Sequence, residues 1–324
     1  MVRAPVPDYT AAVIGNIAQF WRLTRELNVR GLRDQFERPA RMSVLGSDLA
    51  SAERIARLID PDPLLGGIEV GRLGEPGPMG ADVHVLALGG QLDPAARRAV
   101  AELVSDGTPI VVVVLQAEGG ADMLVVGVPE ERMVVLPPDW DDPLARERVL
   151  SALVQAAPEA MLPLGRQHPP LRDSVARQLI RETARVNAQF AALSSLPANV
   201  PLVGGLVGDM ADMLVLTKNQ ILLLFKLAGL YGRDLELGQQ LLVEVLPVVG
   251  GAFFWRSTAR ALVGLLPSVL GLLPKTIIAY TGTYVVGELA RYYYQVGRQP
   301  PPGLARDLRI EGERLARRLF GPRG

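Results

Sequence analysis

Short apolar runs alternate with helical patterns between residues 42 and 156, and this alternation predicts a parallel sheet with helices on its faces. The strand-like runs are Met42–Leu45, a weak edge strand around Gly67–Val70, Val83–Leu88, Pro109–Leu115, Met123–Val126 and Met133–Leu136. The helical runs are Asp48–Ile59, Pro94–Ser105 with Asp93 as its N-cap, and Pro143–Ala156. We therefore expect a doubly wound α/β domain.

The flanking segments carry a different pattern. Tyr9–Phe36 predicts one helix that Pro39 ends. After the proline-rich passage Pro158–Pro170, the segment Leu171–Leu196 predicts a long helix with one apolar side, formed by Val175, Leu179, Ile180, Val186 and Phe190. Pro197–Tyr294 is apolar and glycine-rich without period-2 alternation, which predicts packed helical hairpins.

Four parts follow from these patterns. We expect an N-terminal helix over residues 1–40, the α/β domain over 41–160, a glycine-rich apolar helical domain over 161–299 and a basic amphipathic tail over 300–324.

Composition narrows the function classes. The 34 basic and 34 acidic residues balance, so no general basic field favours nucleic acid as a partner. The absence of cysteine excludes disulfides, thiolate zinc sites and thiol nucleophiles. An acidic cluster of Asp139, Asp141 and Asp142 lies at a predicted helix start, where we interpret it as capping rather than metal binding. We expect no metal.

The second half of the chain resembles a known family. The residues that carry the resemblance are Leu164–Arg172, Leu179–Arg181, Thr183, Ala184, Asn187, Ala188 and Pro201–Gly205. Over residues 160 to 295 they resemble the helical domain of unknown function attached to bacterial Era-like GTPases, and the helical part of YcjF-type inner-membrane proteins. The preceding strands, with Asp82 and Gly107–Val114, resemble the GTPase domain that such helical domains follow. The resemblance implies a P-loop-type sheet and an inner-membrane location.

The nucleotide motifs that this resemblance implies are degraded. No lysine occurs in the first 217 residues, although a phosphate loop uses one to hold the β and γ phosphates. The loop after the first strand keeps Gly46 but has Asp48 where phosphate would approach. Gly74–Gly77 lacks the metal-linked aspartate, and Gln116 and Glu118 replace residues of the base-reading loop. The degenerate positions are Gly46, Asp48, Gly77, Gln116 and Glu118. We expect no catalytic residue and no cofactor.

The two histidines lie far apart in the sequence and outside any metal-ligand spacing. His84 falls within a predicted strand and is interpreted as a satisfied core or sheet-face residue. His168 lies in the proline-rich passage, where it is a candidate tie between the two domains. No serine stands in a Gly-x-Ser-x-Gly elbow.

The lengths of the apolar runs indicate how the chain could associate with a membrane. The longest strongly apolar run without charge, Ala261–Pro274, has 14 residues, whereas a spanning helix needs about 20. We therefore expect peripheral or hairpin-type association through Pro197–Tyr294, on the cytoplasmic face of the inner membrane. The arginines of the predicted helix Leu304–Phe320 would assist at an anionic lipid surface, and a solvated helix docked on its own protein is an equal alternative.

The leading hypothesis is a non-catalytic pseudo-GTPase adaptor or scaffold that contacts the membrane surface and a protein partner, such as a GTPase or a membrane protein. One alternative is an atypical nucleotide-binding GTPase in which Arg41 or Arg54 replaces the missing lysine. A second alternative is a soluble protein whose helical half binds a small molecule or lipid.

Overall fold

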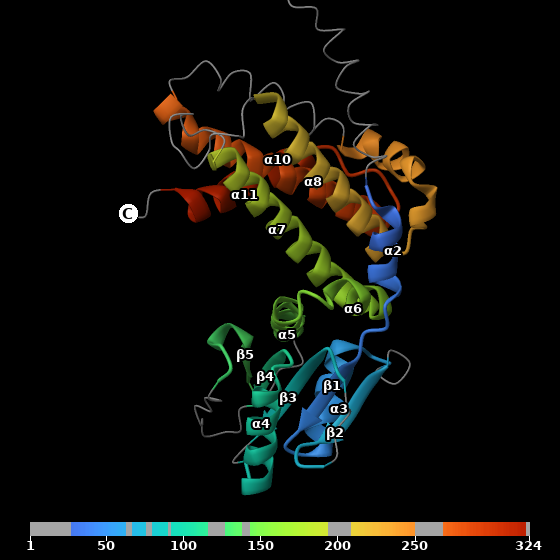
Figure 1. Cartoon of the computed structure of the whole chain (residues 1–324), viewed down its shortest axis with the longest axis vertical. Helices are drawn as coiled ribbons and strands as arrows, with labels where there is room; N and C mark the ends of the chain where they lie inside the picture. Colours follow the sequence, from blue (N-terminus) through green and yellow to red (C-terminus); the bar gives the residue numbers. More distant parts are fainter. Residues whose placement is uncertain are drawn as a thin grey trace, which may run out of the picture. The chain divides into compact units, whose positions relative to one another are not determined.

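The structure is a computed structural model that describes residues 27–62, 67–75, 80–89, 92–115, 127–137, 143–193, 209–249 and 268–321 (Figure 1). The chain divides into two compact units. The α/β unit comprises Asp34–Gln178. The helical unit comprises Leu179–Gly324 together with the N-terminal residues Met1–Arg33.

Five parallel strands form the sheet of the α/β unit, in the order β2-β1-β3-β4-β5. Their bounds are β1 Met42–Gly46, β2 Ile68–Arg72, β3 Val83–Gly89, β4 Ile110–Leu115 and β5 Met133–Leu136. The inner strands β1, β3 and β4 are buried along almost their whole length, as in a sheet that is covered on both faces. The predicted parallel α/β class is confirmed. The strand expected at Met123–Val126 lies outside the described residues.

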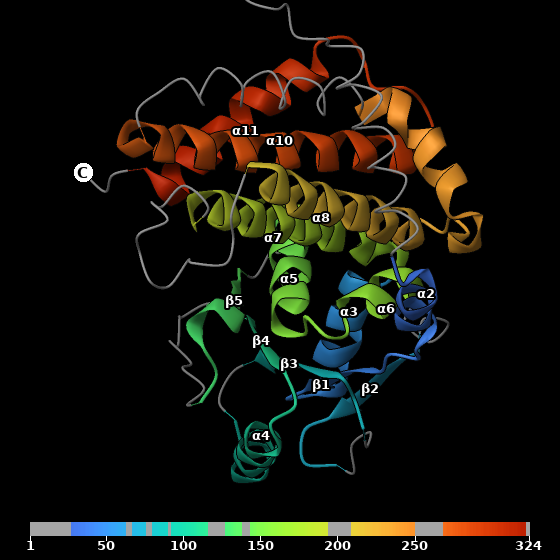
Figure 2. The same cartoon turned by 45° about the horizontal axis from the view of Figure 1, so that its top comes forward.

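Three helices cover the two faces of this sheet. α3 (Leu49–Ile59) and α5 (Pro143–Ala156) lie on one face and α4 (Pro94–Asp106) lies on the other (Figure 2). The α4 face buries alternate strand residues, among them Leu45, Leu86, Leu88, Val112 and Val114, against Ala96 and Val100. The predicted N-cap of α4 is confirmed, because the Asp93 carboxylate accepts a hydrogen bond from the Ala96 N–H at 2.7 Å.

The proline-rich passage after α5 is folded onto the α/β unit. It contains α6 (Met161–Gln167) and a 3-10 turn, η2 (Pro169–Leu171), with Leu164 and Leu171 in the core. The division between the two units comes after this passage in the chain. It lies within α7 (Arg172–Leu193), between Gln178 and Leu179.

The helical unit is arranged around one long helix, α10 (Ser268–Val296). Its other elements are the C-terminal part of α7, α8 (Asp209–Leu230), η3 (Leu235–Leu237), the helical residues 239–249 and α11 (Leu304–Phe320). Every residue from 279 to 290 of α10 is buried. A Cβ at Gly287 would lie 2.7 Å from Ile180 of α7 and 3.2 Å from Leu223 of α8, so glycine lets three helices meet at this point.

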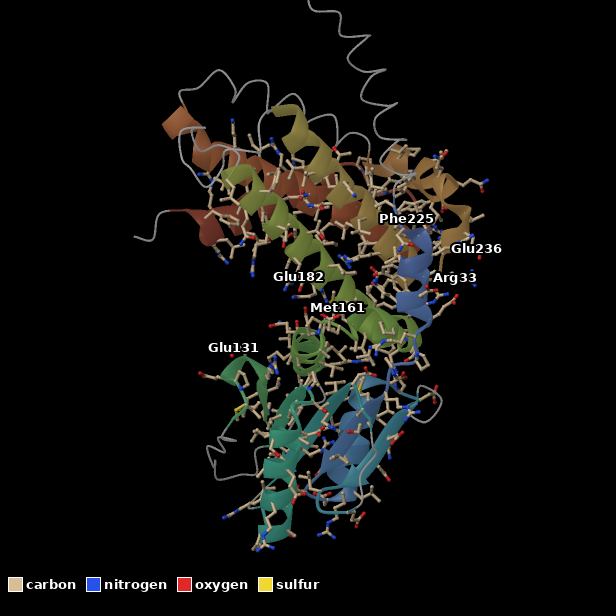
Figure 3. The ribbon with its side chains drawn as sticks, in the orientation of Figure 1. Arg33, Glu131, Met161, Glu182, Phe225 and Glu236 are labelled. Carbon is tan, nitrogen blue, oxygen red and sulfur yellow. The ribbon has the colours of Figure 1, made fainter. Side chains whose placement is uncertain are left out.

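The N-terminal helix is described only in part. Of the helix expected over Tyr9–Phe36, the structure describes α2 (Val29–Glu37), which ends two residues before Pro39 as predicted. Arg33 of α2 forms an ion pair with Glu236 of η3 within the helical unit (Figure 3). Both side chains are largely exposed, so the pair contributes little to stability.

The apolar side expected for α7 was partly wrong. Val175, Leu179 and Ile180 are buried as predicted, but Val186 is 50% exposed. Asn187 is fully buried instead, because this helix turns a polar position toward α10.

A buried polar network connects three helices around Thr283 of α10. Its hydroxyl accepts hydrogen bonds from Asn187 Nδ2 of α7 at 2.9 Å and from Gln220 Nε2 of α8 at 3.1 Å, and it donates to the Ala279 carbonyl. Asn219 Nδ2 extends the network by donating to Asn187 Oδ1. The hydroxyl of Thr283 is therefore fully used, and it fixes the register of α7 and α8 against α10.

Among the helices of the described residues, none combines the length and the apolar character needed to cross a bilayer.

We expect Thr283→Val to lower the free energy of unfolding by about 2–4 kcal/mol, because two buried amide donors lose their acceptor. Thr281→Val is the matched control: Thr281 is equally buried on the same helix, but within the described ranges its hydroxyl has no hydrogen-bond partner. Its replacement should be neutral or stabilising. Urea unfolding followed by circular dichroism measures both, and equal effects of the two substitutions would contradict the role given to Thr283.

Candidate functional site

The topology points to the carboxyl ends of β1 and β3. The chain leaves β1 toward β2 on one side and leaves β3 toward β4 on the other, so a switch point lies between these two strands. Doubly wound sheets bind their ligands in the crevice outside such a switch point. The residues that follow β1 and β3 are therefore the candidate site of the α/β unit.

A very short turn connects β1 to α3 at the switch point. Only Ser47 and Asp48 separate the end of β1 from the first residue of α3. The Ser47 N–H donates to the Ala87 carbonyl at 3.0 Å, and the Ser47 hydroxyl accepts from the Gly89 N–H at 3.1 Å. These bonds attach the turn to the end of β3.

Gly46 is required by the tightness of the turn. A Cβ at this residue would lie 2.3 Å from the Asp48 carbonyl and 2.9 Å from the Ala52 amide nitrogen, both backbone atoms. A phosphate loop, in contrast, places several residues with converging N–H groups between strand and helix. The two residues here leave no such cradle.

The Asp48 carboxylate occupies the amino end of α3. It accepts hydrogen bonds from the Ser51 N–H at 2.8 Å and the Ser51 hydroxyl at 2.7 Å. These two bonds are the main reason that the pKa of Asp48 lies below its usual value; desolvation opposes them, and Ser47 and Ala50 add smaller effects that also lower it. The amino end of a helix is the place where a P-loop protein binds phosphate. In this chain a fixed carboxylate fills that place.

The amino end of α4 beside the switch point is occupied in the same way. Asp93 caps it, and Pro94 at its first position removes one of the N–H groups that a ligand could use. The two helices that follow β1 and β3 are therefore both capped by aspartate side chains of the chain itself.

The predicted degenerate positions fall partly within the structure. Gly46 and Asp48 lie together in the turn after β1, whereas Gly77, Gln116 and Glu118 lie outside the described residues. Sequence reasoning missed Ser47 and Ser51. An available signal was the spacing of Ser51 three residues after Asp48, which is typical of an N-cap and its N3 partner. In the described ranges, no three His, Asp or Glu side chains group closely enough to hold a metal ion.

His84 lies on the α4 face of the sheet, as predicted for a satisfied sheet-face residue. Its Nδ1 is 2.5 Å from the Ser43 hydroxyl on the paired strand β1. Burial lowers the pKa of His84, and the charge of Asp106 opposes that effect. Ser43 is fully buried and His84 is 4% exposed, so this Ser–His pair is closed to a substrate and stabilises the sheet.

His168 makes a second buried contact at the amino edge of the sheet. Its Nδ1 is 2.8 Å from Asp60 Oδ2 at the end of α3, and its Nε2 has no hydrogen-bond partner among the described residues. Both residues belong to the α/β unit, so this bond is internal to that unit and does not tie it to the helical unit as predicted. It fixes the α6–η2 segment to α3.

The amino edge also carries a small cavity of about 300 Å³. Its polar lining groups are Asp82, Glu159 and Thr108, and alanine and proline residues form the rest. Asp82 is already used, because it accepts from Arg38 Nη1 and from the Arg41 N–H, each at 2.9 Å. Thr108 likewise donates to Asp106. The cavity therefore has few groups left for a ligand.

Comparison of the chain with protein-family models, with curated proteins and with solved structures found no match.

Replacing Asp48 with alanine should cost about 1 kcal/mol of unfolding free energy near neutral pH, because α3 loses its N-cap. Asp48→Asn should cost less, since asparagine also caps. The pKa of Asp48 is depressed in the folded chain, so its extra stabilisation is present above the unfolded value of about 3.9 and is lost as the pH falls through the lower folded pKa. Thermal melts against pH should show the difference between wild type and Asp48→Asn changing only in acid, and a change near pH 7 would refute the assignment.

The Asp60–His168 bond should give a coupling energy of about 1–3 kcal/mol in a double-mutant cycle of Asp60→Ala and His168→Leu. Each single substitution leaves a buried polar group without its partner, so both should destabilise the α/β unit. Asp62→Ala is the control, because Asp62 is exposed and contributes only its backbone N–H to Asp60. Simple additivity of the two substitutions would show that the bond carries no energy.

Proposed function

We propose that the chain is a non-catalytic adaptor whose α/β unit is a GTPase-like scaffold without nucleotide binding. The observation that carries the proposal is the capped turn after β1, in which Asp48 occupies the amino end of α3. A nucleotide phosphate would need that helix end and would meet a negative charge there instead. The absence of lysine from the first 217 residues supports the same conclusion.

The expected loss of affinity is large. A hydrogen bond to a charged group is worth roughly 1.5–3 kcal/mol, and about 1.4 kcal/mol corresponds to a tenfold change in affinity. Loss of the lysine contact and of the loop amides would therefore weaken Mg-nucleotide binding by several powers of ten. Repulsion by Asp48 adds to that loss.

The competing function is an enzyme in which an arginine replaces the lysine. Arg41 precedes β1, and its N–H donates to Asp82 at the amino edge of the sheet. The five residues of β1 separate Arg41 from the switch point, a distance of about 17 Å. Arg41 therefore does not suit the role. Arg54 lies on the exposed side of α3. It is therefore the arginine to substitute when this alternative is tested.

The helical unit supports a scaffold more than a carrier of small molecules. Its centre is packed where α7, α8 and α10 meet, since Thr283 bonds to both neighbours and a Cβ at Gly287 would collide with Ile180. Packed and polar-bonded helices suit a rigid body that presents surfaces to a protein partner.

The proposal predicts no saturable binding when the full chain is titrated with a fluorescent guanine or adenine nucleotide and Mg²⁺, even at concentrations of about 1 mM, the upper end of typical substrate affinities. Isothermal calorimetry with unlabelled GTP provides a second readout. Arg54→Ala should behave like the wild type. Asp48→Asn keeps the cap and removes the charge, so it distinguishes repulsion of the phosphate by Asp48 from the absence of loop amides. Binding only in this variant would show that the charge alone prevents nucleotide binding. Micromolar binding by the wild type that Arg54→Ala abolishes would overturn the proposal and establish an arginine-dependent nucleotide site instead.

A further inference from the structure

The C-terminal helix α11 packs on α10 through one narrow side. Leu308, Gly312 and Ala316, each four residues apart, are its buried residues. A Cβ at Gly312 would lie 3.0 Å from the Tyr284 ring and 3.3 Å from Thr281, so the two helices approach closely. The Phe320 ring meets Tyr280 edge to face, with ring centroids 6.1 Å apart. These contacts fix which side of α11 faces away from α10.

The opposite side of α11 is a basic face. We use this name for Arg306, Ile310, Arg314, Arg317 and Arg318, of which the first four follow at intervals of four, four and three residues and therefore share one side of the helix. All five side chains are exposed, and Ile310 is 47% exposed between Arg306 and Arg314. Ile310 thus lies between guanidinium groups, and the exposed carboxylate of Asp307 lies on the same side of the helix, beside Arg306.

The arginines of the basic face are poorly paired. Among the described residues, Arg314, Arg317 and Arg318 form no ion pair, and Arg306 has only an exposed contact of 3.8 Å with Asp307. Helix α11 also carries Glu311 and Glu313. Glu311 is hydrogen-bonded to Tyr284, where it helps raise the pKa of that tyrosine, so it is directed toward α10. No acidic residue follows Glu313 within the helix.

The helix dipole explains part of this pattern. Cations in the last turn, here Arg317 and Arg318, stabilise the carboxyl end of a helix. That effect is confined to the last turn. The helix dipole therefore does not explain why Arg306 and Arg314, which precede the last turn, are arginines. It also does not explain the exposed isoleucine between them.

We propose that the basic face of α11 lies on an anionic phospholipid surface. Guanidinium groups bind phosphate with paired hydrogen bonds, and a helix with basic and apolar side chains on its outer side suits the headgroup region. The face extends over 13 residues, about 18 Å along the helix, without a groove that would select a single carboxylate. An extended layer of phosphates matches this geometry better than one acidic peptide. The inference does not depend on whether the α/β unit binds nucleotide.

The test is sedimentation of the full chain with vesicles. We expect binding to vesicles of phosphatidylcholine mixed with phosphatidylglycerol, and little binding to vesicles of phosphatidylcholine alone. Each arginine near such a surface contributes about fivefold, so the triple variant Arg314→Gln, Arg317→Gln, Arg318→Gln should bind roughly a hundredfold more weakly. Salt should weaken the wild type in the same direction. Ile310→Ser should reduce the part of the binding that persists in high salt.

The matched control is the triple variant Arg97→Gln, Arg98→Gln, Arg148→Gln. It removes the same charge from exposed arginines of the α/β unit. Unchanged thermal midpoints would show that both triple variants fold. Equal losses in the two variants would reduce the effect to net charge and overturn the proposal. So would equal binding to both vesicle types, or no binding to either. Binding of polyglutamate, lost only in the α11 variant and without vesicle binding, would identify an acidic protein as the partner instead.

Discussion

The two-residue turn between β1 and α3 is the constraint on which the α/β unit depends. Gly46 has no room for a side chain, because the Asp48 carbonyl and the Ala52 amide lie where a Cβ would be. A turn this short must satisfy the first N–H groups of α3 from its own atoms, and Asp48 does so through Ser51. The same geometry that makes the strand-to-helix connection stable therefore removes the anion site that longer loops provide at this place in a doubly wound sheet.

In the helical unit, the corresponding constraint is the burial of α10 on all sides between residues 279 and 290. A helix enclosed by neighbours needs small residues where the neighbours approach. Gly287 of α10 lets α7 and α8 come close, and Gly312 of α11 lets α11 come close to α10. The enclosed polar groups need partners within the bundle, and Thr283 supplies one for both Asn187 and Gln220. Because the buried side of α11 is the row Leu308, Gly312 and Ala316, the arginines of the basic face lie on its outer side.

The sequence predicted those parts of the fold that depend on local pattern. β4 is a run of β-branched residues that could form little but a buried strand, and the N-cap of α4 was readable from Asp93 and Pro94. The polar network was not predictable, since Asn187 and Thr283 are 96 residues apart and neither has a local signal. Val186 was predicted on the wrong side of α7 for the same reason. Apolar periodicity does not show that Asn187 is buried by its hydrogen bond to Thr283, which is distant in the sequence. At the candidate site, Gly46 and Asp48 were singled out from the missing lysine, but the bond from Asp48 to Ser51 was not.

The two units use their charges differently, and this difference connects the two proposals. Four aspartates of the α/β unit are engaged within it: Asp48 and Asp93 cap helices, Asp60 contacts His168, and Asp82 accepts hydrogen bonds from Arg38 and from the backbone before β1. An anionic ligand at the carboxyl edge of the sheet would have to displace a cap and would leave a carboxylate beside it. The arginines of the basic face of α11 are exposed, and in the described part of the chain only Arg306 has an ion-pair contact, so an anionic surface would displace mainly water and counterions. Affinity for phosphate groups is thus physically disfavoured where the fold would place a nucleotide and favoured on the outer side of the C-terminal helix.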